Sequence, residues 1–468
     1  MNQYRIPEGL CKINVISHLY FNEKMNDKYN NLFIGIILIL ILGFSFGYTS
    51  FLLCLLVLII RLFTSDKNTV GIFLLMYGGV VGGVIRLMYP FVPLYGLFLN
   101  FIGIALLRKT LSGLFVNNKS SILFLLLVFV VFGICYMYGP KTEFATTKYL
   151  TMLQNGVFLL LGYYALLKSR DYSPVVLSQV LIITALSMIS FDIVFYHMKP
   201  GGLFDFNWFR QQETDYFYSN DQQGFIVSYQ HIGVMALLGT AIFLSQISLK
   251  RTYILLYIVL PAMIILMSGA RQAIFGLFGV LILRYAIFNK RNIGKKGRLG
   301  KFLLSFVGIL VLLLFASYIL PLLNIDVINA TLQSGDEGRM LLFIESLEMF
   351  NNNYLFGLGF GGFEHFTVSD QPWPHNFFLE ILCECGLFGL ISLSMLVLIY
   401  FVKNKIRIMA QTSQGMFYFL IVSAIMMSFM VSADFRESIA LFCAIFAIST
   451  TNQVNKKKLR NINCVDKI

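Results

Sequence analysis

The residues best suited to chemistry lie in one C-terminal stretch of the sequence: Arg339, His375, Asn376, Glu380 and Glu384. A glycine-rich turn precedes the histidine, and the two glutamates lie inside an apolar segment that follows it. Ionisable residues next to or within apolar segments are costly unless they serve a function. An arginine and a histidine held at a membrane surface favour chemistry on an anionic group.

His375 is the candidate general base. It follows Pro-Trp-Pro, whose prolines restrict the backbone, and it precedes Asn376, a residue type that caps helix N-termini. The dipole of the following helix favours the neutral imidazole that a base needs, whereas a nearby diphosphate would favour the charged form. A purely structural hydrogen-bonding role is the alternative for this side chain.

Two arginines are candidate anion ligands. Ser268-Gly-Ala separates two apolar runs, so Arg271 should begin the outgoing helix, where its charge opposes the helix dipole. It has no acidic neighbour in sequence, which predicts a bound anion or a distant carboxylate. Arg339 follows Asp336 and Glu337, so a local ion pair is the alternative there.

Glu380 and Glu384 are four residues apart, so both carboxylates should lie on one face of a helix. Like charges repel there, and we expect the pair to be protonated or matched to arginines on the outer side. We also expect Glu380, Glu384 and Asn376 to contact substrate. The preceding Gly357-x-Gly-x-x-Gly362 has the spelling of a dinucleotide-binding turn without the strand and helix that such a turn requires. A turn with close backbone packing is the better prediction.

An aromatic segment at 196–224 contains Trp208 and Arg210. Its rings suit an interfacial belt, or a platform that binds sugar faces, and we expect Trp208 and Arg210 to contact substrate. Glu213 and Asp215 are a minor option for a divalent cation. We assign no metal site, no cofactor and no disulfide.

The composition is that of a polytopic membrane protein. The chain has 468 residues, of which 57% are hydrophobic and 13% charged, and apolar runs recur along its length. We predict an all-α fold of about 14 transmembrane helices (12–14), with 32–63 forming two spans or one. The predicted spans are 32–47, 49–63, 69–89, 91–107, 121–138, 148–167, 175–195, 225–247, 252–268, 271–288, 302–323, 377–402, 415–431 and 437–452.

The charge distribution predicts the orientation. The net charge is +13, and most Lys and Arg fall in segments that this span order assigns to the inside. We therefore expect a cytoplasmic segment 1–31, a transmembrane domain 32–452 with outer loops 196–224 and 324–376, and a basic cytoplasmic tail 453–468. Two basic clusters, Lys290 to Lys301 and Lys456-Lys-Lys458, favour contact with lipid headgroups, and no nucleic acid is expected as a partner.

These residues together resemble the bacterial O-antigen ligase and polysaccharide-polymerase superfamily, over about residues 225–402. The matching motifs are Ser268-Gly-Ala-Arg271, Gly338-Arg339, Leu355-Phe-Gly-Leu-Gly-Phe-Gly-Gly-Phe363 and His375-Asn-x-x-Leu-x-x-x-x-Glu384-x-Gly-x-x-Gly389. The resemblance implies a GT-C-like membrane glycosyltransferase with its large outer loop before the third-last span. It implies action on glycans carried by undecaprenyl diphosphate, at the outer face of the cytoplasmic membrane, with inversion at the anomeric carbon.

In this reading Arg271 and Arg339 clamp the lipid diphosphate, His375 activates the acceptor hydroxyl, and no metal is needed. We favour a polymerase of repeat units for O-antigen or capsule, with a flippase and a chain-length regulator as further partners. A ligase that transfers the finished glycan is the first alternative. A flippase or exporter of the same lipid is the second, although a transporter should present charged residues to both sides of a central cavity.

Overall fold

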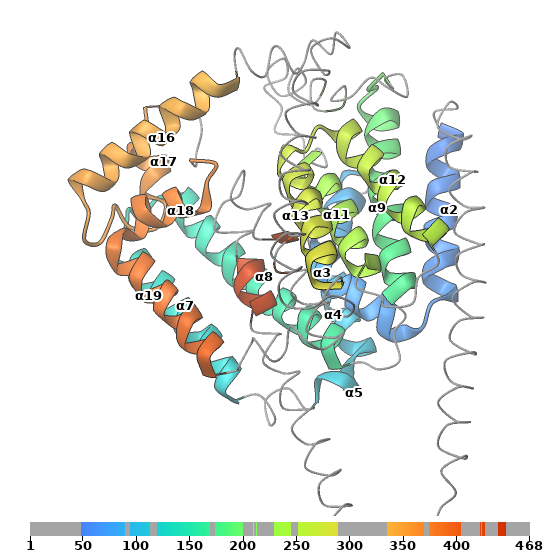
Figure 1. The fold of residues 1–468 in the computed structure, drawn as a ribbon, viewed down its shortest axis with the longest axis horizontal. Helices are drawn as coiled ribbons and strands as arrows, with labels where there is room; N and C mark the ends of the chain where they lie inside the picture. The colour runs from blue at the N-terminus through green and yellow to red at the C-terminus, as the bar shows by residue number, and fades with distance from the viewer. Residues whose placement is uncertain are drawn as a thin grey trace, which may run out of the picture.

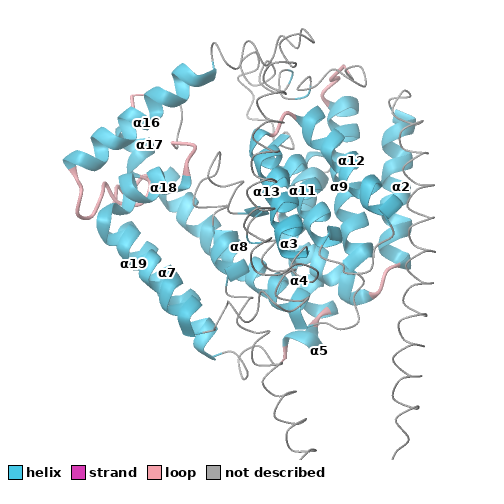
Figure 2. Cartoon of the chain, in the orientation of Figure 1, coloured by secondary structure: helices cyan, strands magenta, loops and turns pink. Residues whose placement is uncertain are grey.

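The computed structural model describes residues 48–88, 94–112, 119–168, 174–199, 209, 212, 229–244, 251–288, 335–368, 374–403, 422, 424–425 and 439–445. These residues form helices joined by turns, with no strand among them (Figure 2). The observed helices agree with the predicted all-α class.

The helices follow one another along the chain with short connections where the connections are described. Their bounds are α2 Tyr48–Thr64, α3 Lys67–Met88, α4 Tyr95–Leu106, α5 Arg108–Leu111, α7 Lys119–Tyr138, α8 Glu143–Lys168, α9 Pro174–Phe195, α11 Tyr229–Leu244, α12 Arg251–Ser268, α13 Arg271–Phe288, α16 Gly335–Asn352, α17 Gly362–Phe366, α18 Phe377–Glu380, the π-helix η3 Ile381–Cys385 and α19 Gly386–Lys403.

Three helical segments in the described residues are long and apolar enough to cross a membrane: Lys67–Ile85, Val175–Phe195 and Phe377–Tyr400. Shorter apolar helices lie at six further places where spans are predicted. The predicted spans 32–47 and 302–323, and most of the last two, lie outside the described residues. The total of about fourteen spans therefore stays a prediction.

Figure 1 shows the helices in two groups. Helices α2, α3, α4, α9, α11, α12 and α13 form a bundle, and α9 at its centre is buried along most of its length. Helices α7, α16, α17, α18 and α19 form the other group, and α8 packs against members of both.

Polar and glycine contacts hold the bundle together. Arg61 of α2 donates to the Gln179 side chain of α9, whose amide donates to the Tyr257 hydroxyl of α12 over 2.8 Å. Helices α3 and α4 pack backbone to backbone, since a Cβ added to Gly82 would lie 2.2 Å from the amide nitrogen of Gly96. Small residues and interhelical hydrogen bonds of this kind drive helix association in membranes. The bundle thus provides a rigid support for α8.

Candidate functional site

The segment after His375 is a broken helix. It begins at α18, where the Asn376 Oδ1 accepts hydrogen bonds from the amides of Phe378 at 3.0 Å and Leu379 at 3.1 Å. The predicted N-cap is therefore confirmed. The helix widens into η3 and is interrupted at Gly386, whose φ is 62°. A continuous predicted span thus contains a break a few residues after its start.

The glycine turn replaces the hydrogen bonds that the break removes from the helix. The amides of Leu358 and Gly359 donate to the carbonyls of Cys383 at 2.8 Å and Glu384 at 2.9 Å. In the other direction, the amide of Leu387 donates to the Tyr354 carbonyl at 2.9 Å. A helix end buried in a membrane needs such partners, because no water satisfies its backbone groups there. The turn and the broken helix therefore form one folding unit.

Close backbone packing explains why this turn is rich in glycine. Gly357, Gly359 and Gly361 have φ values of 71°, 82° and 79°, which L-residues with side chains rarely adopt. A Cβ added to Gly359 would lie 2.1 Å from the Cα of Gly139, at the end of α7. The predicted close-packed turn is confirmed.

We expect Gly359→Ala to destabilise the protein. A left-handed backbone costs a non-glycine residue about 1–3 kcal/mol, and the added methyl group would also displace Gly139. Heating the detergent-solubilised variant and following its monodisperse fraction should show earlier unfolding. Gly79→Ala is the matched control, since a Cβ there meets nothing within 4 Å. Equal stability of the two variants would contradict this account of the turn.

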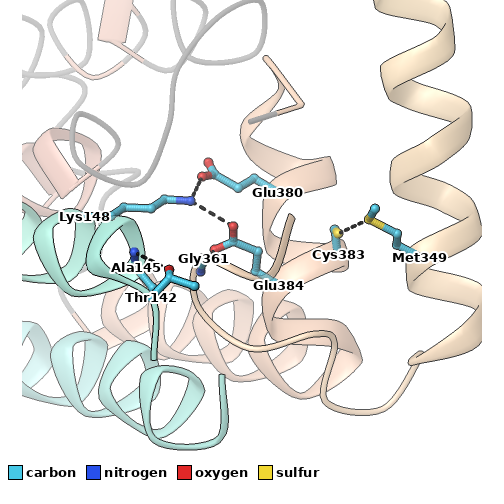
Figure 3. Close-up of polar contacts among 8 residues, drawn as sticks. All are labelled: Thr142, Ala145, Lys148, Met349, Gly361, Glu380, Cys383 and Glu384. Carbon is cyan, nitrogen blue, oxygen red and sulfur yellow. Dashed lines mark hydrogen bonds and ion pairs between the residues drawn. The ribbon is translucent and has the colours of Figure 1, made fainter. Parts of the chain in front are cut away.

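Three charged side chains meet next to the turn (Figure 3). The Lys148 Nζ of α8 lies 2.6 Å from the Glu380 Oε1 and 2.9 Å from the Glu384 Oε1, and all three side chains are fully buried. The Glu384 Oε2 accepts a hydrogen bond of 2.9 Å from the Gly361 amide. The prediction for this pair is protonation or pairing with outer-side arginines, whereas the partner that the structure describes for both carboxylates is a lysine.

Sequence reasoning placed Lys148 at an outer helix end and gave it no role. Helix α8 in fact begins earlier, at Glu143, where the Thr142 hydroxyl accepts from the Ala145 amide at 3.0 Å. Because the helix begins five residues before Lys148, this side chain lies in its second turn and not at its end. Its Nζ is 5.3 Å from the centre of the Phe360 ring. A lysine at the start of an apolar span was the signal that could have marked Lys148 as functional, although no local pattern names its partner.

His375 lies directly before the cap of the broken helix. Its φ is 54°, and only one other non-glycine residue of the described chain, His197, has a positive φ. Such a conformation persists where the surroundings impose it, and it often occurs at functional sites. Pro374 on one side is buried and Asn376 on the other caps α18, while the imidazole itself is partly exposed.

Helix α16 holds the start of the loop that leads to His375. The Glu345 Oε1 accepts hydrogen bonds from the Thr367 hydroxyl at 2.9 Å and the Val368 amide at 2.7 Å. Leu342, Phe363 and Cys383 form a small core between α16, α17 and η3. The segment Gly335–Asn352 is thus a helix that packs on the broken span.

The two predicted arginines belong to different helix groups. Arg271 is the first residue of α13, after Gly269 with a φ of 70°, which confirms its predicted place at a helix start. Helix α13 packs in the bundle with α11 and α12. Arg339 lies in the first turns of α16, which packs against α18 and η3. The structure therefore brings the helix of Arg339 into contact with the helix that follows His375, and Arg271 comes from the bundle.

The aromatic loop is described only in part. Trp208 and Arg210 lie outside the described residues, as do Glu213 and Asp215. Phe209 between the first two is fully buried, so its ring cannot serve as the sugar platform considered for this loop. Within this loop, the Lys199 amide donates a hydrogen bond to the Gln212 Oε1 at 2.6 Å.

The residues of this candidate site lie in a part of the chain that matches a known protein family. Residues 256–394 match the model of a family described as O-antigen ligase, and this range includes both arginines, the glycine turn, His375 and the two glutamates. No curated protein matched the chain. Together with the apolar helices, the family match indicates a bacterial membrane protein of polysaccharide assembly. The match over residues 256–394 confirms the predicted resemblance to the O-antigen ligase and polysaccharide-polymerase superfamily.

Proposed function

We propose that the protein polymerises oligosaccharide repeat units carried on undecaprenyl diphosphate into a surface polysaccharide. The observation that carries the proposal is His375, held with a positive φ at the capped start of a broken helix inside the family match. A partly exposed imidazole fixed between a buried proline and a helix cap suits a base that must meet an incoming hydroxyl.

The reaction is a displacement at the anomeric carbon. The His375 imidazole takes the proton of an acceptor sugar hydroxyl while the hydroxyl oxygen forms a bond to that carbon. The bond from the carbon to the diphosphate oxygen breaks, so the configuration inverts and undecaprenyl diphosphate leaves with its electron pair. Because the leaving group is already a stable anion, fixed cations can replace an acid or a metal.

Arg271 and Arg339 are the proposed cations. The planar guanidinium matches two phosphate oxygens at once, which gives both charge and orientation. Arg339 belongs to α16, which packs on α18, the helix that follows His375, and Arg271 belongs to α13 in the bundle. A clamp shared between two helix groups would fix the diphosphate between them.

We place this site at the outer face of the bacterial cytoplasmic membrane, with both termini inside. The distribution of Lys and Arg supports this orientation. The proposed partners are the lipid-linked oligosaccharide, the bilayer, a flippase that delivers the donor and a chain-length regulator. Arg210 and Trp208 remain proposed contacts to the glycan.

A ligase has the same chemistry and differs in its acceptor, so it is the second candidate. The family match supports both reactions equally. A flippase would need no general base, and a histidine held in a costly backbone conformation would then have no task.

Deleting the gene should separate these functions by the glycan that accumulates. Loss of a polymerase leaves single repeat units, some of them passed on to the final acceptor. Loss of a ligase instead leaves long chains on the lipid carrier, and loss of a flippase leaves single units inside the cell. Mass spectrometry of extracted lipid-linked glycans, before and after enzymatic treatment of intact cells from outside, distinguishes the three. Long lipid-linked chains in the deletion strain would overturn the polymerase proposal.

A further inference from the structure

The buried cluster of Lys148, Glu380 and Glu384 has no task in the proposed reaction. Its three side chains are fully buried, and the two carboxylates lie within 3 Å of the same ammonium group. Charged groups in a membrane interior are expensive and are kept where they pair with one another for a purpose. Apolar residues would stabilise a simple helix contact at lower cost.

Glu384 joins three segments of the chain. One carboxylate oxygen contacts the Lys148 ammonium of α8, and the other accepts the Gly361 amide of the glycine turn. The residue itself belongs to η3, and its backbone carbonyl accepts the Gly359 amide. Figure 3 shows the carboxylate between the lysine and the turn. Any movement of α8 relative to the broken helix must therefore break one of these contacts.

Glu380 extends the connection toward His375. Its carboxylate contacts Lys148 at 2.6 Å, and its backbone amide donates to the Asn376 carbonyl at 2.9 Å. Asn376 is the next residue after His375 and caps the same short helix. A chain of direct contacts thus runs from α8, which the bundle supports, to the residue beside the proposed base.

We propose that Lys148, Glu380 and Glu384 form a buried latch that positions His375 relative to the bundle. The proposal rests on the proposed function, and it replaces the expectation that the two glutamates contact substrate. Lys148 is then a positioning residue, because it acts through Glu380 and Asn376 and touches no reacting atom. Since Arg271 also belongs to the bundle, the latch fixes the base against one half of the diphosphate clamp.

Other contacts should hold the broken helix in the membrane without the latch. The amides of Leu358, Gly359 and Leu387 keep their backbone partners, and Phe360 stays packed between Phe132 and Tyr149, with ring centres 6.1 and 5.6 Å away. Loss of the latch should therefore displace α18 slightly and leave the fold in place. Displacements of about 1 Å can cost up to 10²-fold in rate.

The test compares Lys148→Met with Lys141→Met in purified protein reconstituted in nanodiscs. Lys141 lies two residues before α8 and is exposed, so the same chemical change there is the control. The probe is lipid-linked repeat units extracted from a strain that lacks the gene. We expect Lys148→Met to lower kcat about tenfold or more with KM changed less than about twofold. Lys141→Met should match the wild type.

Two further substitutions test the geometry of the latch. Glu380→Gln keeps an acceptor oxygen for Lys148, so its loss of kcat should be small. Glu384→Gln places an amide group against either the Lys148 ammonium or the Gly361 amide, so its loss should approach that of Lys148→Met. Equal kcat values for Lys148→Met and the wild type would overturn the latch, as would a loss confined to KM.

A thiol reporter separates the latch from the proposed function, because it needs no activity. Cys383 forms no disulfide and is fully buried under α16, where its thiol donates to the Met349 sulfur at 3.7 Å. In a protein with its other cysteines replaced, a maleimide should label Cys383 about tenfold faster in Lys148→Met than in the wild type. Unchanged labelling overturns the latch, whereas a wild type that transfers no glycan overturns the function. If Lys148→Met fails to accumulate, the same criteria apply to Lys148→Met combined with Glu384→Gln.

Discussion

His375→Ala should abolish long-chain surface glycan while single repeat units are still made and transported across the membrane. Removal of a general base costs roughly 10²–10⁴-fold in rate, which is enough to erase a glycan ladder in cells. The substitution removes the imidazole and leaves the Asn376 cap, so the broken helix should still insert. The measurement is a gel of surface glycan from cells that express each variant at equal membrane levels.

His365→Ala is the control for this experiment. His365 lies ten residues earlier in α17, is exposed, and lacks both the prolines and the positive φ of His375. Its alanine variant should keep a full ladder. A full ladder from His375→Ala would refute the base assignment, and failure of that variant to insert would support a structural role for the histidine instead.

Arg271→Lys and Arg339→Lys should each lose most activity, on the order of 10²-fold or more, while the protein is still inserted. Lysine keeps the positive charge but cannot form two parallel hydrogen bonds to phosphate oxygens. The expected loss is comparable to removal of one preorganised donor from a transition state. Initial rates of glycan transfer by the two purified variants measure the effect.

The same assay in EDTA tests whether the arginines replace a metal. We expect full activity, because the guanidinium groups already neutralise the leaving diphosphate. Wild-type rates in both lysine variants would refute the clamp. Loss of activity in EDTA would shift attention to Glu213 and Asp215 of the aromatic loop.

Sequence reasoning identified features that depend on local chemistry. The break at Gly269 before Arg271, the Asn376 cap and the tight glycine turn each follow from the conformational preferences of a few adjacent residues. Most helix bounds also follow local apolar runs, because a span in lipid must satisfy its own backbone groups.

Features that depend on contacts between distant segments were missed. The buried glutamates pair with Lys148 of α8, which precedes Glu384 by 236 residues in the sequence. No local pattern identifies that partner. At the π-helix Ile381–Cys385, amides of the glycine turn donate to carbonyls that the break leaves without helical partners. Because these donors come from another segment, the sequence of the span alone predicts one continuous helix. The positive φ of His375 likewise reflects Pro374 burial and the cap together.

The proposed reaction joins two lipid-linked glycans and breaks the bond between the donor's anomeric carbon and its diphosphate. The most direct measurement incubates the purified protein in nanodiscs with lipid-linked repeat units from a strain that lacks the gene, and follows glycan length and free undecaprenyl diphosphate by mass spectrometry. We expect longer lipid-linked chains, with one undecaprenyl diphosphate released for each unit added. Unchanged repeat units with no lipid diphosphate released, from a wild-type protein that is folded and correctly inserted, would contradict it.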